Sequence, residues 1–385
     1  MSRKSESENQ VKRSSQGQLI LYHGMKLSTM FKLFALKPSL SLKRWIRLGL
    51  MPSWGLYNSF FAGVEKLVYG KRIEQTEMAG PPIFILGYWR SGTTMLHSMM
   101  AADERFNYPT LYEAVFPWHF LSTEKVFTAL TGWMVPKSRP MDNVEVHWKV
   151  PQEDEFAICA MCLVSPYTLP LRPFDQQEWT RSFHIDDLPP EDRKLWEDSI
   201  THFMKKLTLR KPRPLVMKSP SHTYRIKAIL KLFPDAKFIH ISRHPFDVFN
   251  STLHLRSTMI EENTLGHSYH PDAEDSVIRT FMDAYYTYER EKSAIPEGNL
   301  VEVKYEELAA EPLKHLERVY RELNLPDFEV VRPQLEVKLA GHKNYKKNRF
   351  QVDKHWQQQV YERCREFYER FGYPSPEQED REAAA

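Results

Sequence analysis

The chain has 385 residues, a net charge of +3 and three cysteines. Its hydrophobic fraction of 42% and its charged fraction of 27% are close to the averages of folded soluble domains. So small a net charge does not indicate a nucleic-acid-binding surface, and no nucleic-acid partner is expected. Three cysteines cannot form a disulfide framework, which favours a reducing compartment, and we expect a cytoplasmic protein.

Both ends of the chain are polar and predict disordered tails, over residues 1–17 and 374–385. Residues 18–79 predict a helical N-terminal segment, in which the stretch 43–68 combines basic and aromatic residues. Such a helix more often packs against its domain. The alternative is contact with a membrane surface, which would make the protein membrane-peripheral. No apolar run is long enough to predict a membrane-spanning helix.

The most informative stretch begins with the apolar run Ile83–Leu86, which predicts a buried strand. A loop bounded by Gly87 and Gly92 follows it and leads into a helix. The spacing is that of a phosphate-binding P-loop, but Thr93 stands where an NTPase has its lysine. The pattern therefore predicts an anion site made of loop N–H groups, a helix N-terminus and the Arg90 guanidinium, without chemistry on a γ-phosphate.

From residue 80 onward, predicted strands alternate with helices. Further apolar strands are expected at 214–218, 236–242 and 300–303, and helical spacing of apolar residues appears at 226–233. Units of strand, helix and strand with short turns build parallel sheets. The pattern predicts an α/β fold over residues 80–373. We expect a P-loop-like three-layer domain with a central, mainly parallel sheet flanked by helices.

Arg243 and Ser251 predict a second anion site. Arg243 follows the predicted strand 236–242, and open α/β sheets bind ligands at the carboxyl ends of their strands. Pro245 suits the first turn of the next helix, and Ser251 follows about two turns later. A guanidinium and a hydroxyl that converge there can bind a second phosphate.

Together these motifs resemble the sulfotransferases that use 3′-phosphoadenosine 5′-phosphosulfate (PAPS), in particular a bacterial-type branch related to tyrosylprotein sulfotransferases. The stretch 87–94 resembles the 5′-phosphosulfate loop of this family, and Arg243 with Ser251 resembles its 3′-phosphate site. Lys218 looks like the lysine that tyrosylprotein sulfotransferases carry upstream of that arginine. Tyr305 resembles their nucleotide-side tyrosine. The order and intervals agree over most of the chain.

The resemblance implies PAPS as co-substrate and no metal. It also implies that a basic loop near the C-terminus closes over the 3′ end of the nucleotide, and the stretch 341–349 matches that description without showing which lysine touches the ligand. The expected nucleotide-binding residues are Arg90, Ser91, Gly92, Thr93, Thr94, Met95, Arg243, Ser251, Tyr305 and Lys346.

In the reaction that the resemblance implies, an acceptor hydroxyl attacks sulfur in line with the leaving phosphate oxygen. Arg90 and Lys218 are expected to stabilise the charge on that oxygen. A carboxylate is expected to act as general base, with Glu113 as the first candidate and Glu153 as the second. Glu153 begins an acidic cluster before an apolar helix, where acids can also serve the helix dipole.

The acceptor stays open among small molecules, lipids and carbohydrates that carry a hydroxyl group. Aromatic residues in the stretch 108–181 predict apolar walls for its pocket. Two other functions remain: a P-loop nucleotide kinase-like enzyme and a catalytically inactive nucleotide-binding protein. The missing P-loop lysine disfavours the kinase. The sequence leaves the oligomeric state undetermined.

Overall fold

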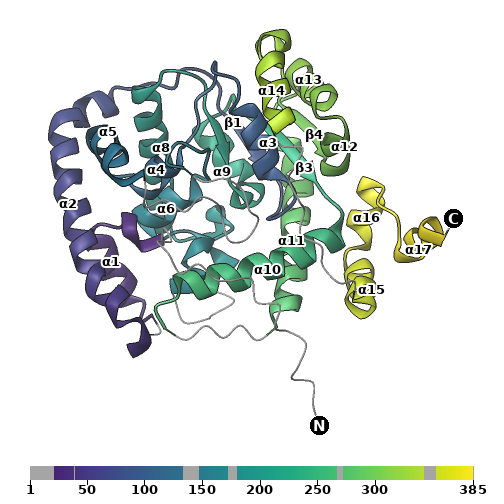
Figure 1. Ribbon diagram of the computed structural model, residues 1–385, viewed down its shortest axis with the longest axis horizontal. Coiled ribbons are helices and arrows are strands. Elements are labelled where there is room, and N and C mark those ends of the chain that lie inside the picture. Colours follow the sequence, from purple (N-terminus) through teal and green to yellow (C-terminus); the bar gives the residue numbers. More distant parts are fainter. Residues whose placement is uncertain are drawn as a thin grey trace.

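The computed structural model describes residues 21–38, 40–132, 147–171, 180–266, 272–341 and 353–384. At the centre of this described part lies a sheet of four parallel strands in the order β2-β1-β3-β4 (Figure 1). The strands are β1 (Ile83–Leu86), β2 (Val216–Lys218), β3 (Lys237–Ser242) and β4 (Leu300–Lys304). The predicted parallel sheet is therefore confirmed.

Helices cover both faces of the sheet. Successive strand residues point to opposite sides, so apolar strand residues can pack against helices on both faces. Phe84 and Phe238 belong to one hydrophobic cluster, whereas Ile85 and Ile239 belong to another. Helices that contribute to the first cluster are α4 (Leu111–Val115), α5 (Phe120–Thr131), α6 (Glu155–Cys162), α8 (Pro190–Arg210) and α9 (Ile226–Leu232). Those of the second are α3 (Thr93–Met100), α12 (Tyr305–Ala310), α13 (Pro312–Glu322) and α14 (Arg332–Gly341). The predicted three-layer α/β architecture is confirmed.

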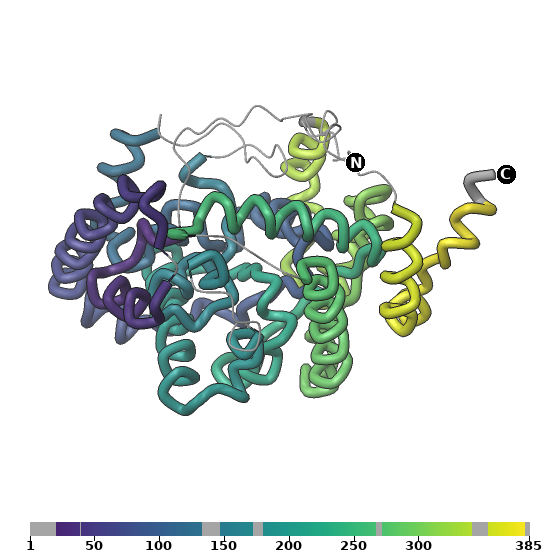
Figure 2. Tube along the Cα trace, turned by 90° about the horizontal axis from the view of Figure 1, so that it is seen from below, coloured from purple at the N-terminus to yellow at the C-terminus, as the bar shows by residue number. Residues whose placement is uncertain are grey.

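Two further hydrophobic clusters attach the remaining helices. One joins α10 (Pro245–Asn263), α11 (Ala273–Glu291), α15 (Lys354–Arg363) and α16 (Arg365–Phe371). The other joins α1 (Leu27–Ala35) and α2 (Trp45–Glu74) to α6. The N-terminal helices and the C-terminal helices consequently lie at opposite ends of the molecule (Figures 1 and 2).

The N-terminal helices pack on the domain through polar as well as apolar contacts. The Asn58 amide of α2 donates to the carbonyl oxygens of His23 and Met25, at 2.6 and 2.9 Å. The Glu65 carboxylate of α2 pairs with Lys206 of α8, and both side chains are buried. Burial lowers the pKa of Lys206 to about 8, although Glu65 opposes that shift. Within the described ranges, no helix has the length and apolar character needed to cross a bilayer.

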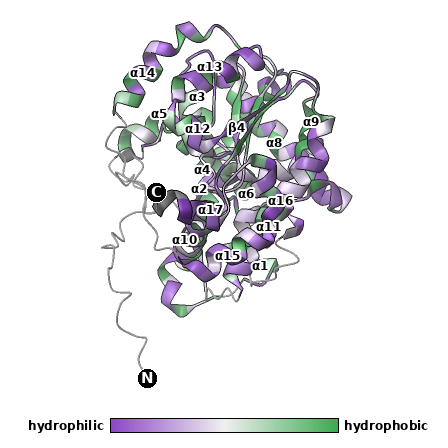
Figure 3. Cartoon of the chain, turned by 90° about the vertical axis from the view of Figure 1, so that its right-hand side faces the viewer, coloured by the Kyte–Doolittle hydropathy of each residue, from purple (hydrophilic) through white to green (hydrophobic). Residues whose placement is uncertain are grey.

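The prediction of a disordered tail over residues 374–385 is wrong, because α17 (Pro376–Ala384) occupies most of it. This helix is strongly hydrophilic (Figure 3) and starts at a reciprocal cap. Ser375 N–H donates to Gln378 at 2.7 Å, and Gln378 N–H donates to the Ser375 hydroxyl at 3.3 Å. Polar contacts then hold α17 on α15, among them Lys354 with Asp380 at 2.6 Å. The helix cap and these polar contacts stabilise α17, which has no apolar face to bury.

Candidate active site

The four strands bring four predicted features to one edge of the sheet. The glycine loop follows β1, Lys218 ends β2, Arg243 follows β3 and Tyr305 follows β4. Since the strands are all parallel, their carboxyl ends meet at the same edge, where open α/β sheets bind ligands. Residues that are far apart in the sequence therefore lie in a single row.

The glycine loop between β1 and α3 has a conformation that requires its glycines. Gly92 has a φ of 103°, in a region that favours glycine, and Arg90 has a φ of 67°. A Cβ atom at Gly92 would lie 2.3 Å from the ring carbon Cδ2 of Tyr305. Tyr305 thus packs directly on the loop where α3 begins. The first N–H groups of α3 have no partner within the helix, which is what an anion seat requires.

Gly92→Ala is expected to disrupt nucleotide binding, since alanine strains the backbone and its Cβ collides with Tyr305. We expect the affinity for 3′,5′-ADP to fall about tenfold or more, as measured by calorimetric titration. Gly63→Ala in α2 is the matched control, because a Cβ atom there meets nothing within 4 Å. It should leave the affinity unchanged and raise the stability by about 0.5–1 kcal/mol. Equal affinities of the two variants would contradict the role of the loop.

Arg90, Ser251 and Arg243 form one connected group. The Arg90 Nε group donates to Ser251 Oγ at 2.7 Å, and Arg243 Nη1 donates to the Arg90 carbonyl oxygen at 3.0 Å. The Arg243 guanidinium also lies over the Tyr305 ring, 4.6 Å from its centroid, and pairs with Asp247 at 3.0 Å. The sequence assigned Arg90 to one phosphate and the other two residues to a second. In the structure Arg90 contacts both Ser251 and Arg243 directly.

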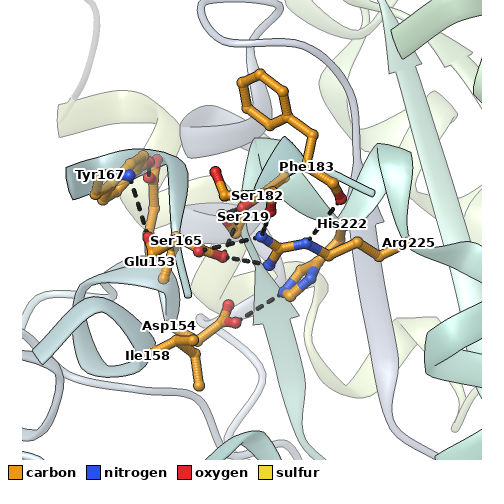
Figure 4. Close-up of polar contacts among 12 residues, drawn as sticks. Glu153, Asp154, Ile158, Ser165, Tyr167, Ser182, Phe183, Ser219, His222 and Arg225 are labelled. Atoms are coloured by element: carbon orange, nitrogen blue, oxygen red, sulfur yellow. Dashed lines mark hydrogen bonds and ion pairs between the residues drawn. The ribbon is translucent and has the colours of Figure 1, made fainter. Parts of the chain in front are cut away.

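Lys218 joins the start of α3 to a carboxylate. This lysine is 1% exposed, and its Nζ lies 2.6 Å from Glu153 Oε1 and 3.5 Å from the Thr94 hydroxyl in the first turn of α3. The other Glu153 oxygen accepts a hydrogen bond from Tyr167, which also accepts one from the Trp89 indole at 3.3 Å (Figure 4). Burial and the Glu153 carboxylate raise the pKa of Tyr167 well above its ordinary value, so it remains a neutral donor.

Glu113, the first candidate for the general base, lies in a different set of contacts. One of its oxygens pairs with Arg210 at 2.6 Å, and the other accepts the Thr110 N–H at 2.7 Å in a capping box at the start of α4. Burial raises the pKa of Glu113, although Arg210 opposes the shift. Both oxygens therefore serve the packing of α4 and α8, whereas Glu153 contacts the predicted catalytic lysine.

Two buried pairs join the residues that follow Glu153 to those that follow Lys218. His222 Nε2 and Asp154 Oδ2 lie 2.8 Å apart, and Arg225 Nη1 lies 2.8 Å from Glu155 Oε2, with all four side chains excluded from solvent (Figure 4). Burial alone would raise the pKa of Asp154, but the contact with His222 leaves it below its ordinary value. These partners could not be identified from the sequence. The acidic cluster was visible there, but no local pattern indicated that the residues after β2 would contact it.

Arg225→Met is expected to destabilise the protein by about 3–5 kcal/mol, because it leaves the Glu155 carboxylate buried without its cation. Urea unfolding monitored by circular dichroism measures this loss. Arg321→Met is the control, since Arg321 is 71% exposed and its nearest acid oxygen is 4.0 Å away. That change should stay within about 0.5 kcal/mol. A similar small effect at Arg225 would show that the buried pair contributes little.

The residues at this edge fit a ligand with two phosphates better than a metal ion. Arg243 Nε is buried and has no hydrogen-bond partner in the described part of the chain, so a donor remains at the candidate second anion site. In the same described ranges, no group of three histidine, cysteine or acidic side chains could hold a metal. Lys346 and its basic loop lie outside the described residues.

Comparison with known proteins assigns the family. A model of the sulfotransferase family matches residues 81–329. The chain is 35% identical over 333 residues to omega-hydroxy-beta-dihydromenaquinone-9 sulfotransferase Stf3 of Mycobacterium tuberculosis and of Mycobacterium bovis, covering 86% of this chain and 85% of each relative.

Two solved mycobacterial structures share the fold. Sulfotransferase STF9 from Mycobacterium avium gives a TM-score of 0.62 at 18% identity and covers 80% of both chains. Sulfotransferase STF1 from Mycobacterium tuberculosis gives 0.59 at 16% identity and covers 88% of this chain and 90% of that one. The family match spans the glycine loop, all four strands and the residues at their ends, and this chain belongs to the sulfotransferase family.

Proposed function

We propose that the protein transfers a sulfuryl group from PAPS to a hydroxyl group of a lipid acceptor. The observation that carries this proposal is the contact of Lys218 with both Glu153 and Thr94. It places a cation between a carboxylate and the first turn of α3. Sulfuryl transfer needs a base for the acceptor proton, a cation for the leaving oxygen and an anion seat, and here the three adjoin.

The nucleotide-binding residues that we propose are those of the loop and the strand ends. Residues 90–95 supply N–H groups and the Arg90 guanidinium, and Arg243 with Ser251 supplies a second set of donors. The Tyr305 ring packs against both the glycine loop and the Arg243 guanidinium. When bound, PAPS supplies the sulfuryl group and the phosphate that leaves. Lys346 belongs to the same proposal as a closing cation.

For the chemical step, we assign Glu153 rather than Glu113 as the general base. Glu153 Oε1 lies 2.6 Å from Lys218 at the end of β2, while Glu113 pairs with Arg210 and caps α4 instead. Glu153 takes the proton of the acceptor hydroxyl as that oxygen attacks sulfur. Lys218 and Arg90 stabilise the negative charge that develops on the leaving oxygen. Tyr167 orients the Glu153 carboxylate by its hydrogen bond.

A lipid acceptor is supported by the relative and by the residues beside the proposed base. The curated relative carries in its name a hydroxylated menaquinone derivative, which is a lipid. Trp89 and Tyr167 present aromatic rings next to Glu153, with centroids 6.5 Å apart, and Phe156 packs on Tyr167 at 5.1 Å. Aromatic walls of this kind suit an apolar acceptor with one hydroxyl end. Such an enzyme would work from the cytoplasm at a membrane surface.

The test combines a binding assay with a transfer assay. Calorimetric titration in EDTA is expected to show tight binding of 3′,5′-ADP that added Mg²⁺ does not improve. Transfer of labelled sulfate from PAPS is expected to be fastest to a hydroxylated isoprenoid quinol, compared with a simple phenol and a monosaccharide. Binding of ATP that requires Mg²⁺, without binding of 3′,5′-ADP, would favour the kinase-like alternative. Fastest transfer to the sugar would overturn the lipid acceptor alone.

A further inference from the structure

The N-terminal helices expose far more apolar surface than the rest of the described chain. Seventeen large hydrophobic side chains are exposed in the whole described part of the chain, and twelve of them lie between residues 31 and 68. Leu67 is 89% exposed and Leu42 is 88% exposed, and Trp45 and Phe60 are each about two thirds exposed. Isolated exposed hydrophobic residues are ordinary, but a concentration of this kind marks an interaction surface.

Four exposed apolar side chains of α2 lie along one face of the helix and form a stripe. Trp45, Leu56, Phe60 and Leu67 follow one another at intervals of eleven, four and seven residues, which places them on the same face. The buried residues of α2 lie on the opposite face and are Met51, Gly55, Asn58, Glu65 and Ile73. A helix of 30 residues is about 45 Å long, so the stripe is also long. The helix thus packs on the domain with one face, through polar and apolar contacts, and presents apolar side chains outward on the other.

The charge of this segment is strongly positive. Residues 21–74, which end with the last residue of α2, contain nine lysines and arginines and two acids, which is a charge of +7 where the whole chain carries +3. Of the two acids, Glu65 is buried against Lys206, and Glu74 is the last residue of α2. Before Glu74, the outward charges are therefore all cations, with Lys43, Lys66 and Lys71 exposed on or near α2. An apolar stripe flanked by cations matches a bilayer that carries anionic headgroups.

The same segment is firmly attached to the part of the molecule that carries the candidate active site. Arg44 and Arg47 donate to the carbonyl oxygens of Glu261 and Glu262, at 3.1 and 2.5 Å. Those two residues lie near the end of α10, which begins at Pro245. In Figure 1, α2 runs along one outer edge of the molecule with α1 beside it. A surface that bound this edge would hold the whole domain in one orientation.

We propose that α2, with α1, docks the protein on an anionic lipid bilayer, with the helix lying in the plane of the interface and the stripe buried among the lipid headgroups. The helix does not cross the bilayer, because its inner face stays on the domain. This inference depends on the surface alone and not on the chemistry of the active site. It would, however, place a sulfotransferase beside lipid acceptors.

The experiment is sedimentation of the full chain with vesicles. Vesicles of phosphatidylcholine with about one third phosphatidylglycerol should bind the protein, and vesicles of phosphatidylcholine alone should bind it several-fold more weakly. Phe60→Ser combined with Leu67→Ser is expected to weaken binding about tenfold or more. The matched control is Val330→Ser combined with Val337→Ser, at two exposed valines outside the N-terminal segment, which should leave binding unchanged.

Other outcomes would overturn the proposal. If both double variants bind vesicles as the unchanged protein does, the stripe is not the docking surface. If the protein is a dimer by analytical ultracentrifugation and Phe60→Ser with Leu67→Ser makes it a monomer, a second copy covers the stripe instead. A label attached at Leu67→Cys gives an independent readout. Its fluorescence should shift to the blue on addition of anionic vesicles, whereas a label at Val337→Cys should not respond.

Discussion

Lys218→Met is expected to lower the rate constant of sulfuryl transfer by about two to three orders of magnitude. Methionine keeps the length and the apolar stem of the side chain but removes the charge that lies 2.6 Å from Glu153. The folded protein should still bind 3′,5′-ADP, because Arg243 and Ser251 are unchanged. Single-turnover transfer of labelled sulfate, measured with saturating PAPS, separates this loss from weaker binding.

Lys206→Met is the matched control for this experiment. Lys206 is also a buried lysine that pairs with a glutamate, but its partner is Glu65 of α2. The control variant should therefore lose stability, seen as a lower midpoint in urea, while its folded fraction keeps the rate constant of the unchanged protein. A rate constant near normal for Lys218→Met would remove this lysine from the mechanism.

Glu153→Gln is expected to lower the rate constant about a hundredfold or more, whereas Glu113→Gln should change it little. Glutamine cannot take the acceptor proton, and only Glu153 contacts Lys218. Glu113→Gln should instead destabilise the protein by about 1–3 kcal/mol, because it removes the charge with which the buried Glu113 side chain pairs with Arg210. Initial rates and urea unfolding of the two variants form a direct comparison.

Chemical rescue distinguishes a base from a residue that only orients Lys218. Formate added to Glu153→Ala is expected to restore part of the activity, since a small carboxylate can occupy the space that the side chain left. The same addition to Glu113→Ala should have no effect. A large loss at Glu113 with no loss at Glu153 would return the base to the position that the sequence favoured first.

Local sequence was sufficient for the loop, the strands and the order of the motifs. The glycine spacing of 87–92, the apolar run of β1 and the arginine after β3 are all contained within short windows, and each has a physical reason that needs no distant partner. The same windows place Lys218 and Tyr305 at strand ends. A parallel sheet then brings these ends to one edge, which confirmed the expected fold.

Short windows failed where several weak interactions act together. The C-terminal residues have no apolar face and were predicted to be disordered, yet the cap at Ser375 and the polar contacts with α15 support a helix. The apolar and basic character of α2 was visible, but whether the helix packs on the domain or exposes its rings was not. In the structure it does both, on opposite faces.

The choice of Glu153 over Glu113 as the proposed base rests on tertiary contacts alone. The sequence ranked Glu113 before Glu153, although both precede or begin a helix where an acid is favourable. Glu153 lies 65 positions before Lys218, and Arg90 lies 161 positions before Ser251. The chain thus encodes locally which groups can bind phosphate, through residue type and spacing. The pairing of each group with its partner comes from the packing of the helices on the sheet, which no local pattern contains.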